Sequence, residues 1–222
     1  MHKSVHGDAI KLMKNIKNNS IDLIHTDPPY KNYQSQRTIK KQKEIKKGGF
    51  SFEWLMNEVN RVLKPGKHFY IWCDAKTFSD AYVALQNTKG LVYKNMIIWV
   101  KNNHGSGDLK SGFAPQHEIC IFGHKGKGIQ FYSKRPSDVL YKKSDNGCIS
   151  FYNKVSASRA GHPTVKPHEI IVKFIEASTK KGEVVLDMYA GSFSTAKAAK
   201  DLGRKSISFE LNKNYFSKFG KI

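Results

Sequence analysis

The tetrapeptide Asp27-Pro28-Pro29-Tyr30 follows an apolar run, residues 21–26, that is typical of a buried strand. Two prolines end the strand and keep the chain out of a helix, because proline lacks an N–H donor and restricts the residue before it. The resulting stiff turn presents a carboxylate, carbonyls and an aromatic ring together. These groups suit a planar amino group: Asp27 and the Pro28 carbonyl accept its two N–H bonds, while Tyr30 stacks on the attached ring. The chemistry is that of an exocyclic amine on a base.

A second pattern lies near the end of the chain, where a strand, a turn of small residues and a helix start follow one another over residues 183–195. Small residues at 190–192 let a ligand approach the main chain, and the positive end of a helix favours a carboxylate. The next strand ends at Glu210, placed to accept both hydroxyls of a ribose. This arrangement is typical of a nucleotide or nucleoside site. A capped strand-to-helix connection without a ligand gives a similar pattern.

The elements that must position these two turns alternate along the chain. Hydrophobic spacing predicts helices over residues 8–16, 51–63, 78–85, 167–179 and 194–202, with a further helix at the end. Apolar runs predict strands over residues 21–26, 69–73, 93–100, 119–122, 184–187 and 206–209, so the first predicted element is a helix. Alternation of this kind predicts an open α/β sheet.

Length and composition indicate one compact domain. The chain has 222 residues, 39% of them hydrophobic, and no apolar run approaches the roughly 20 residues of a membrane span. The N-terminal residues lack the apolar segment of a signal peptide. Three widely spaced cysteines, Cys73, Cys120 and Cys148, favour neither a zinc site nor a disulfide framework. We therefore expect a cytoplasmic protein that binds no metal.

The charge is strongly positive, with 38 Lys and Arg against 18 Asp and Glu. Residues 31–49 carry seven basic residues and one acidic residue, and residues 123–161 carry eight and two. Charge gathered in two loop-like segments favours a polyanionic partner, because each neutralised phosphate releases counterions. A lysine-rich proteome is the alternative explanation.

Combined, these motifs resemble the β class of amino-methylating DNA methyltransferases, which use S-adenosylmethionine. That family has Asp-Pro-Pro-Tyr early, a His-Pro-Thr-x-Lys-Pro segment late, and a glycine cofactor loop after it. Here residues 27–30, 162–167 and 186–195 follow the same order. Weaker matches are Gly7-Asp8, residues 62–66, Trp99 with Lys101 and Asn102, and residues 117–122. The chain departs from the family at Phe193, which replaces a glycine and which we interpret as a tolerated variant.

The resemblance implies a doubly wound, mostly parallel Rossmann-like methyltransferase sheet with a small inserted target-recognition segment. It implies a single domain, 1–222, with a catalytic half over about 1–101, a recognition segment over about 103–160 and a cofactor-binding half over about 161–222. The target base must be flipped out of the duplex to expose its amino group. In this family an aspartate as first motif residue usually accompanies adenine N6, and a serine cytosine N4.

The sequence leaves several alternatives open. The target is adenine N6 by preference and cytosine N4 as the alternative. A non-catalytic DNA-binding subunit derived from the family would also carry these motifs, as would a methyltransferase acting on RNA or on a protein glutamine. A nucleotide-binding oxidoreductase leaves residues 27–30 unexplained. Double-stranded DNA is the expected partner, and both a homodimer and a cognate restriction endonuclease stay open.

The candidate site residues fall into three groups. The catalytic candidates are Asp27, Pro28, Pro29 and Tyr30. The cofactor-binding candidates, several of them implied by the resemblance alone, are Asp8, Asp27, His162, Thr164, Lys166, Asp187, Tyr189, Ala190, Gly191, Ser192, Ser194, Thr195 and Glu210. The candidates for DNA contact are Arg37, Lys40, Lys41, Lys46, Lys47, Lys134, Arg135, Lys142, Lys143 and Arg159.

Overall fold

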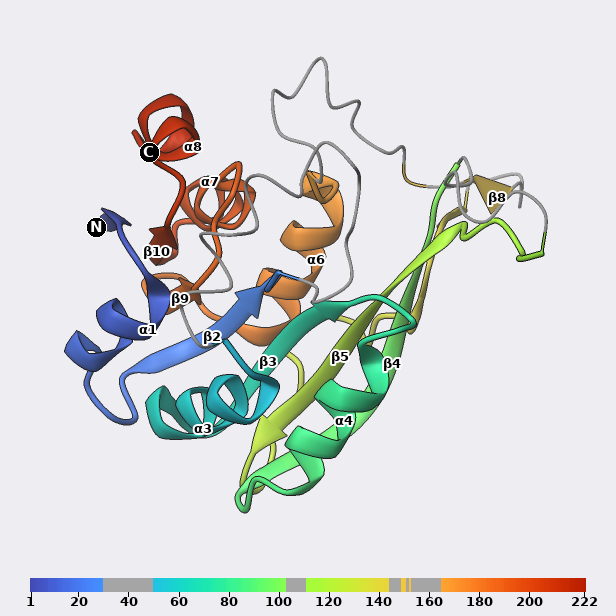
Figure 1. Ribbon diagram of the computed structural model, residues 1–222, viewed down its shortest axis with the longest axis horizontal. Coiled ribbons are helices and arrows are strands. Elements are labelled where there is room, and N and C mark those ends of the chain that lie inside the picture. The colour runs from blue at the N-terminus through green and yellow to red at the C-terminus, as the bar shows by residue number, and fades with distance from the viewer. Residues whose placement is uncertain (30–49, 103–110, 144–148, 151, 153–164) are drawn as a thin grey trace.

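The computed structural model describes residues 1–29, 50–102, 111–143, 149–150, 152 and 165–222. Within these residues an eight-stranded sheet crosses the molecule in the order β1-β10-β9-β2-β3-β5-β4-β6 (Figure 1). Its strands are β1 His2–His6, β2 Ile21–Thr26, β3 Leu63–Cys73, β4 Leu91–Val100, β5 His117–Lys125, β6 Val139–Leu140, β9 Val184–Asp187 and β10 Lys205–Glu210. The short strands β7 Lys142–Lys143 and β8 Ile149–Ser150 pair separately.

Helices cover both faces of the sheet (Figure 1). One face packs against α1 Ala9–Leu12, the 3-10 turn η1 Met13–Asn15, α3 Phe52–Val62 and α4 Phe78–Gln86. The other packs against α6 His168–Ser178 and α7 Ser194–Asp201, and α8 Lys213–Phe219 closes the chain. Alternate residues of a strand point to opposite faces, so Phe69 and Ile71 of β3 enter the first core while Tyr70 and Trp72 enter the second.

The local sequence explains why these helices form where they do. Ser51 accepts a hydrogen bond from the backbone N–H of Trp54 at 3.1 Å, which caps the start of α3. The buried residues of α3 recur at helical spacing and face the sheet: Phe52, Leu55, Met56, Val59 and Val62. The N-terminus of α8 is capped in the same way by Asn212, which accepts from the N–H groups of Asn214 and Tyr215.

Strand direction defines the edge at which a ligand binds. Strands β1, β10, β9, β2 and β3 are parallel, whereas β5 is antiparallel to both β3 and β4. The chain runs outward from β2 to β3 on one side and from β9 to β10 on the other. The switch point therefore lies between β9 and β2, where doubly wound sheets bind ligands outside the carboxyl ends of the strands. The predicted doubly wound, mostly parallel α/β fold is confirmed.

Two local predictions were wrong. The first element is strand β1, not a helix: it lies at the edge of the sheet, is only partly buried, and its polar sequence His-Lys-Ser-Val-His lacks an apolar run. Residues 64–66, predicted only to stop a helix, already belong to β3, whose pairing with β2 shifts register between Ile21 and Leu23.

No helix in the described part of the chain combines the length and the apolar character that crossing a membrane requires.

Candidate active site

Four acidic residues stand in a row at the carboxyl edge of the parallel strands. Asp8 follows β1, Glu210 ends β10, Asp187 ends β9 and Asp27 follows β2, and these four strands are neighbours in the sheet. Residues separated by as many as 202 positions in the sequence are thus brought to one edge. The two predicted sites, the proline turn and the small-residue turn, meet at the switch point.

The carboxylate of Asp27 is held by a buried lysine. The ammonium of Lys166 binds Oδ2 of Asp27, and it also lies 3.2 Å from Oε2 of Glu118. Burial acts to lower the pKa of Lys166, but the two carboxylates outweigh burial and raise that pKa above its ordinary value. The face of the Trp72 ring lies 5.1 Å from the same ammonium. Lys166 was assigned by resemblance to the cofactor, and here it contacts the catalytic candidate.

Asp187 is buried under the turn that follows β9. Its Oδ2 accepts from the Thr195 hydroxyl at 2.6 Å, and its Oδ1 accepts from the Thr26 hydroxyl and from the backbone N–H of Tyr189, each at 3.1 Å. Burial raises the pKa of Asp187 to about 6, although these hydrogen bonds act in the opposite direction. Asp187 therefore ties the end of β9 to β2 and to the start of α7.

A buried histidine that the sequence analysis did not single out extends this network. The indole N–H of Trp72 donates to Nε2 of His25 at 2.9 Å, so the proton of the neutral ring is on Nδ1, which lies 2.9 Å from Oγ1 of Thr195. Burial, and next the charge of Lys166, lower the pKa of His25 to about 3. A directed chain of hydrogen bonds therefore runs from Trp72 through His25 and Thr195 to Asp187. The signal available in the sequence was a histidine within the run predicted to be a buried strand, residues 21–26.

The turn after β9 is fixed by backbone contacts with the neighbouring strand. The N–H of Ala190 donates to the carbonyl of Phe209 at 2.8 Å, and the N–H of Gly191 donates to Oε2 of Glu210 at 2.7 Å. Oε1 of Glu210 accepts from the N–H of Asn212 at 2.7 Å, and burial raises the pKa of Glu210. A carboxylate oxygen has two lone pairs, so these contacts leave Glu210 with acceptor capacity.

Phe193, where the resemblance expects glycine, adopts the left-handed conformation with φ 58°. Glycine adopts this conformation at little cost, which explains the preference of the family. The Phe193 side chain is fully buried, and its ring lies 6.2 Å from that of Phe216. It packs in a small cluster with Ala190, Ala196, Phe219 and Ile222. The bulk of the ring is thus accommodated against the C-terminal segment.

Most of the remaining predicted residues fall into three groups. Ser192 and Ser194 join through their hydroxyls at 2.7 Å at the start of α7. Lys134, Arg135 and Lys142 are exposed, Lys142 pairing with Glu169 at 2.7 Å, and Lys143 lies in β7. Outside the described residues lie Tyr30, Arg37, Lys40, Lys41, Lys46, Lys47, Arg159, His162 and Thr164.

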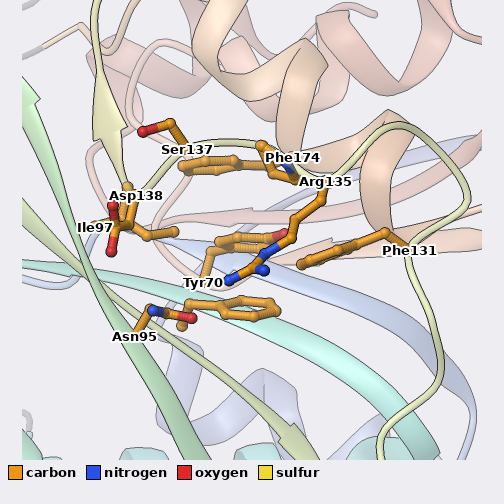
Figure 2. A pocket seen from close by; sticks show the side chains of 10 residues that line it. Tyr70, Asn95, Ile97, Phe131, Arg135, Ser137, Asp138 and Phe174 are labelled. Carbon is orange, nitrogen blue, oxygen red and sulfur yellow. The ribbon is translucent and has the colours of Figure 1, made fainter.

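A cavity of about 410 Å³ lies away from the predicted chemistry, between the sheet, residues 131–138 and α6 (Figure 2). Aromatic side chains form much of its wall, with Tyr70 stacked on Phe174 at a ring distance of 4.2 Å. Arg135, a candidate for DNA contact, extends across the ring edges in Figure 2. Among the described residues, no catalytic or cofactor-binding candidate lines this cavity.

Comparisons with known proteins agree with this geometry. The family model described as DNA methylase matches residues 21–221. The type II methyltransferase M.HpaI of Haemophilus parainfluenzae is 34% identical over 221 residues, which cover 94% of this chain and 69% of that protein. The DNA adenine methyltransferase YhdJ of Escherichia coli K12 is 29% identical over 239 residues, covering 95% of this chain and 79% of that protein.

Solved structures give the same result. The M1.HpyAVI-SAM complex matches with a TM-score of 0.71 and 26% identity, covering 100% of this chain and 99% of that chain. The cytosine-N4-specific PvuII DNA methyltransferase also has a TM-score of 0.71, but at 18% identity it shows the shared fold alone, with 99% and 86% covered. Motif order, sheet topology and a family match over nearly the whole chain lead to one conclusion: this chain belongs to the N6/N4 DNA methylase family.

Proposed function

We propose that this protein transfers a methyl group from S-adenosylmethionine to the exocyclic N6 amino group of an adenine in double-stranded DNA. The observation that carries the proposal is the position of the Asp27 carboxylate. It follows β2 at the switch point of the sheet, beside the strand that ends in Asp187, and a buried lysine holds one of its oxygens. A hydrogen-bond acceptor for the target amine therefore stands next to the turn predicted to bind the cofactor.

The target base enters as a flipped-out nucleotide, because its amino nitrogen is paired and stacked inside the duplex. Asp27 and the Pro28 carbonyl accept the two N–H bonds of the amino group and direct its lone pair at the methyl carbon. Tyr30 stacks on the extruded ring and offsets part of the stacking lost from the duplex. Positioning and fixed charges supply most of the rate, and neither a covalent enzyme intermediate nor a metal takes part.

The residues around the second turn fit the cofactor. S-adenosylmethionine, when bound, supplies an electrophilic methyl group on a positively charged sulfonium. Gly191 has a positive φ and no side chain, so its backbone admits a close ligand. Glu210 ends the next strand with acceptor capacity for ribose hydroxyls, and Asp8 follows the strand beyond it at the same edge. We assign Asp8, Gly191 and Glu210 to the nucleoside end of the cofactor.

Two observations favour adenine. The motif begins with aspartate, which in this family usually accompanies adenine N6. YhdJ, 29% identical over 95% of this chain, is named a DNA adenine methyltransferase. The non-catalytic alternative rested on Phe193, and the ring of that residue packs against Phe216. This packing supports an intact cofactor turn.

Charge supports DNA as the partner. The chain carries a formal charge of +20, and Lys134 and Arg135 are exposed in the segment we assign to target recognition, about 103–160. The catalytic half, about 1–101, and the cofactor half, about 161–222, meet at the switch point in this division.

The test is methyl transfer from labelled S-adenosylmethionine to unmethylated genomic DNA, followed by nucleoside analysis of the digest. N6-methyladenine is the expected product. N4-methylcytosine would keep the mechanism and contradict the assignment of the base. Absence of labelled nucleoside, with cofactor binding still detected by calorimetry, would contradict the proposed reaction.

A further inference from the structure

Four side chains of alternating charge form a line that starts at the catalytic carboxylate. Lys166 binds Oδ2 of Asp27 and lies 3.2 Å from Oε2 of Glu118, and the other oxygen of Glu118 lies 3.6 Å from Nζ of Lys101. They come from four separate places: the turn after β2, the segment before α6, strand β5 and the residue after β4. The line therefore crosses the sheet from the switch point to the antiparallel strands.

Lys166 is the member that must be held in place. Its side chain is only 6% exposed, and a buried ammonium is costly unless opposite charge and hydrogen bonds compensate for lost water. Glu118 compensates on one side, Asp27 on another, and the Trp72 ring on a third. Lys166 is a flexible side chain with three donors, so its position depends on these neighbours.

Asp27 depends on Lys166 in turn. Asp27 lies on the turn directly after β2. Its side chain is 23% exposed, so a substrate can reach the carboxylate. A lysine that binds Oδ2 restricts the orientation of the carboxylate. A lysine free to move would lose this orientation, and displacements near 1 Å cost roughly 100-fold in rate.

We propose that Glu118 is a positioning residue for methyl transfer: by holding Lys166 it fixes the carboxylate of Asp27 toward the target amino group. The role rests on the proposed function and goes beyond it, because Glu118 belongs to strand β5 and acts through Lys166. The negative charge of Glu118 also compensates part of the positive charge of Lys166, which Asp27 contacts as well. The residue before it, His117, is exposed and has no part in the line.

The chain contains a matched control. Glu183 binds Nζ of Lys67 at 2.5 Å, and the side chains of Glu183 and Glu118 are both 22% exposed. Their lysine partners are all mostly buried: Lys67 is 11% exposed, and Lys166 and Lys101 are 6% and 11% exposed. Glu183 precedes β9 and lies at the opposite edge of the sheet, far from the reacting groups. Loss of its charge perturbs an equivalent ion pair without touching Asp27.

The test is a double-mutant cycle on kcat with Glu118→Gln and Lys166→Met. We expect Glu118→Gln to lower kcat by roughly 10- to 100-fold, with the Kd for S-adenosylmethionine within threefold of wild type. In the Lys166→Met background, Glu118→Gln should change kcat by less than twofold, since its effect passes through Lys166. Glu183→Gln should leave kcat within twofold of wild type.

Three results would overturn the inference. One is a Glu118→Gln protein with kcat within threefold of wild type. Another is a full loss of kcat in both backgrounds, which would show that Glu118 acts independently of Lys166. The third is a loss that appears in cofactor Kd instead of kcat. If Glu118→Gln does not fold, Glu118→Asp replaces it in the same cycle, because aspartate keeps the charge on a shorter side chain. We then expect a severalfold loss of kcat when Lys166 is present and no loss in the Lys166→Met background.

The wild-type protein in the same assay reports the proposed function separately. An active wild type with additive variants would contradict the role of Glu118 alone. A wild type without methyl transfer would contradict the proposed function, and the positioning role with it.

Discussion

Strand β2 has an aspartate near each end, and the two ends differ in what their charges do. At the start, Asp22 is 3% exposed, lies 2.7 Å from Lys64 and 3.8 Å from Lys67, and accepts the backbone N–H of Val184 at 3.0 Å. These contacts join the beginnings of β2, β3 and β9. At the other end, Asp27 is more open and is held by Lys166.

The two ends of the strand therefore have different roles: the start contributes to stability, and the carboxyl end provides a group that a ligand can reach. The carboxylate of Asp22 binds groups on neighbouring strands of the protein, so its contacts stabilise the folded state. Asp27 stands at the carboxyl edge, where backbone strands end and a ligand can approach. We therefore expect matched substitutions at the two ends to affect different measurements.

The largest expected effect is on turnover. Asp27→Ala should lower methyl transfer by roughly 1,000-fold, because it removes an acceptor that stabilises the reacting amino group. The variant also removes one of the two carboxylates that compensate the buried Lys166, so turnover is compared per folded molecule. Substantial turnover by folded Asp27→Ala protein would remove Asp27 from the mechanism.

The matched substitution at the other end should act on stability. Asp22→Ala should lower the free energy of unfolding by about 3 kcal/mol, since it removes the buried carboxylate that accepts from Lys64 and from the N–H of Val184. Urea unfolding followed by circular dichroism measures this change. Turnover per folded molecule should stay within threefold of wild type, and a much larger loss would mean that the two ends are not independent.

Phe193 lies at the carboxyl edge of the sheet, like Asp27, but its buried ring contributes to packing, as Asp22 contributes to stability. Phe193→Gly should lower the free energy of unfolding by about 2 kcal/mol: loss of a buried ring outweighs relief of the left-handed backbone. Phe193→Ala should cost more than Phe193→Gly, since alanine keeps the backbone penalty. Both variants should bind S-adenosylmethionine within threefold of wild type by calorimetry. A cofactor affinity raised tenfold by glycine would instead show that the ring obstructs the site.

The smallest expected effect is a pH dependence at Asp187. Its pKa is raised from 3.8 to about 6 in the folded protein, so the folded state binds more protons than the unfolded state between these values. Stability contributed by this group is present at low pH and is lost as pH rises from about 4 to about 6. Relative to Asp187→Asn, the wild type should lose roughly 1 to 2 kcal/mol over this range. Parallel unfolding curves for the two proteins would contradict the assignment.

The sequence motifs could place the candidate site residues at one edge of the sheet, because these residues lie at the ends of strands. Asp27 and Asp187 follow or end strands with apolar runs, and Glu210 ends a strand in which Ile207 and Phe209 alternate with serines. Parallel pairing brings these strand ends to one edge. Strand β1 was missed because a half-exposed edge strand needs no apolar run.

The links between these groups could not be predicted. His25 and Thr195 are 170 residues apart, and their contact depends on strand register and on which face each residue takes. The position of Lys166 on Asp27 depends on the same register and on the packing of α6. Charge counts indicated a polyanionic partner but gave no position to individual lysines, so the candidates for DNA contact stay predictions.

The most direct measurement compares wild type, Asp22→Ala and Asp27→Ala in one assay, with labelled S-adenosylmethionine, unmethylated DNA and nucleoside analysis, at a temperature where all three are folded. The account predicts N6-methyladenine from wild type and from Asp22→Ala, and none above background from Asp27→Ala. Labelled N6-methyladenine from Asp27→Ala at the wild-type rate, or none from the wild type, would contradict it.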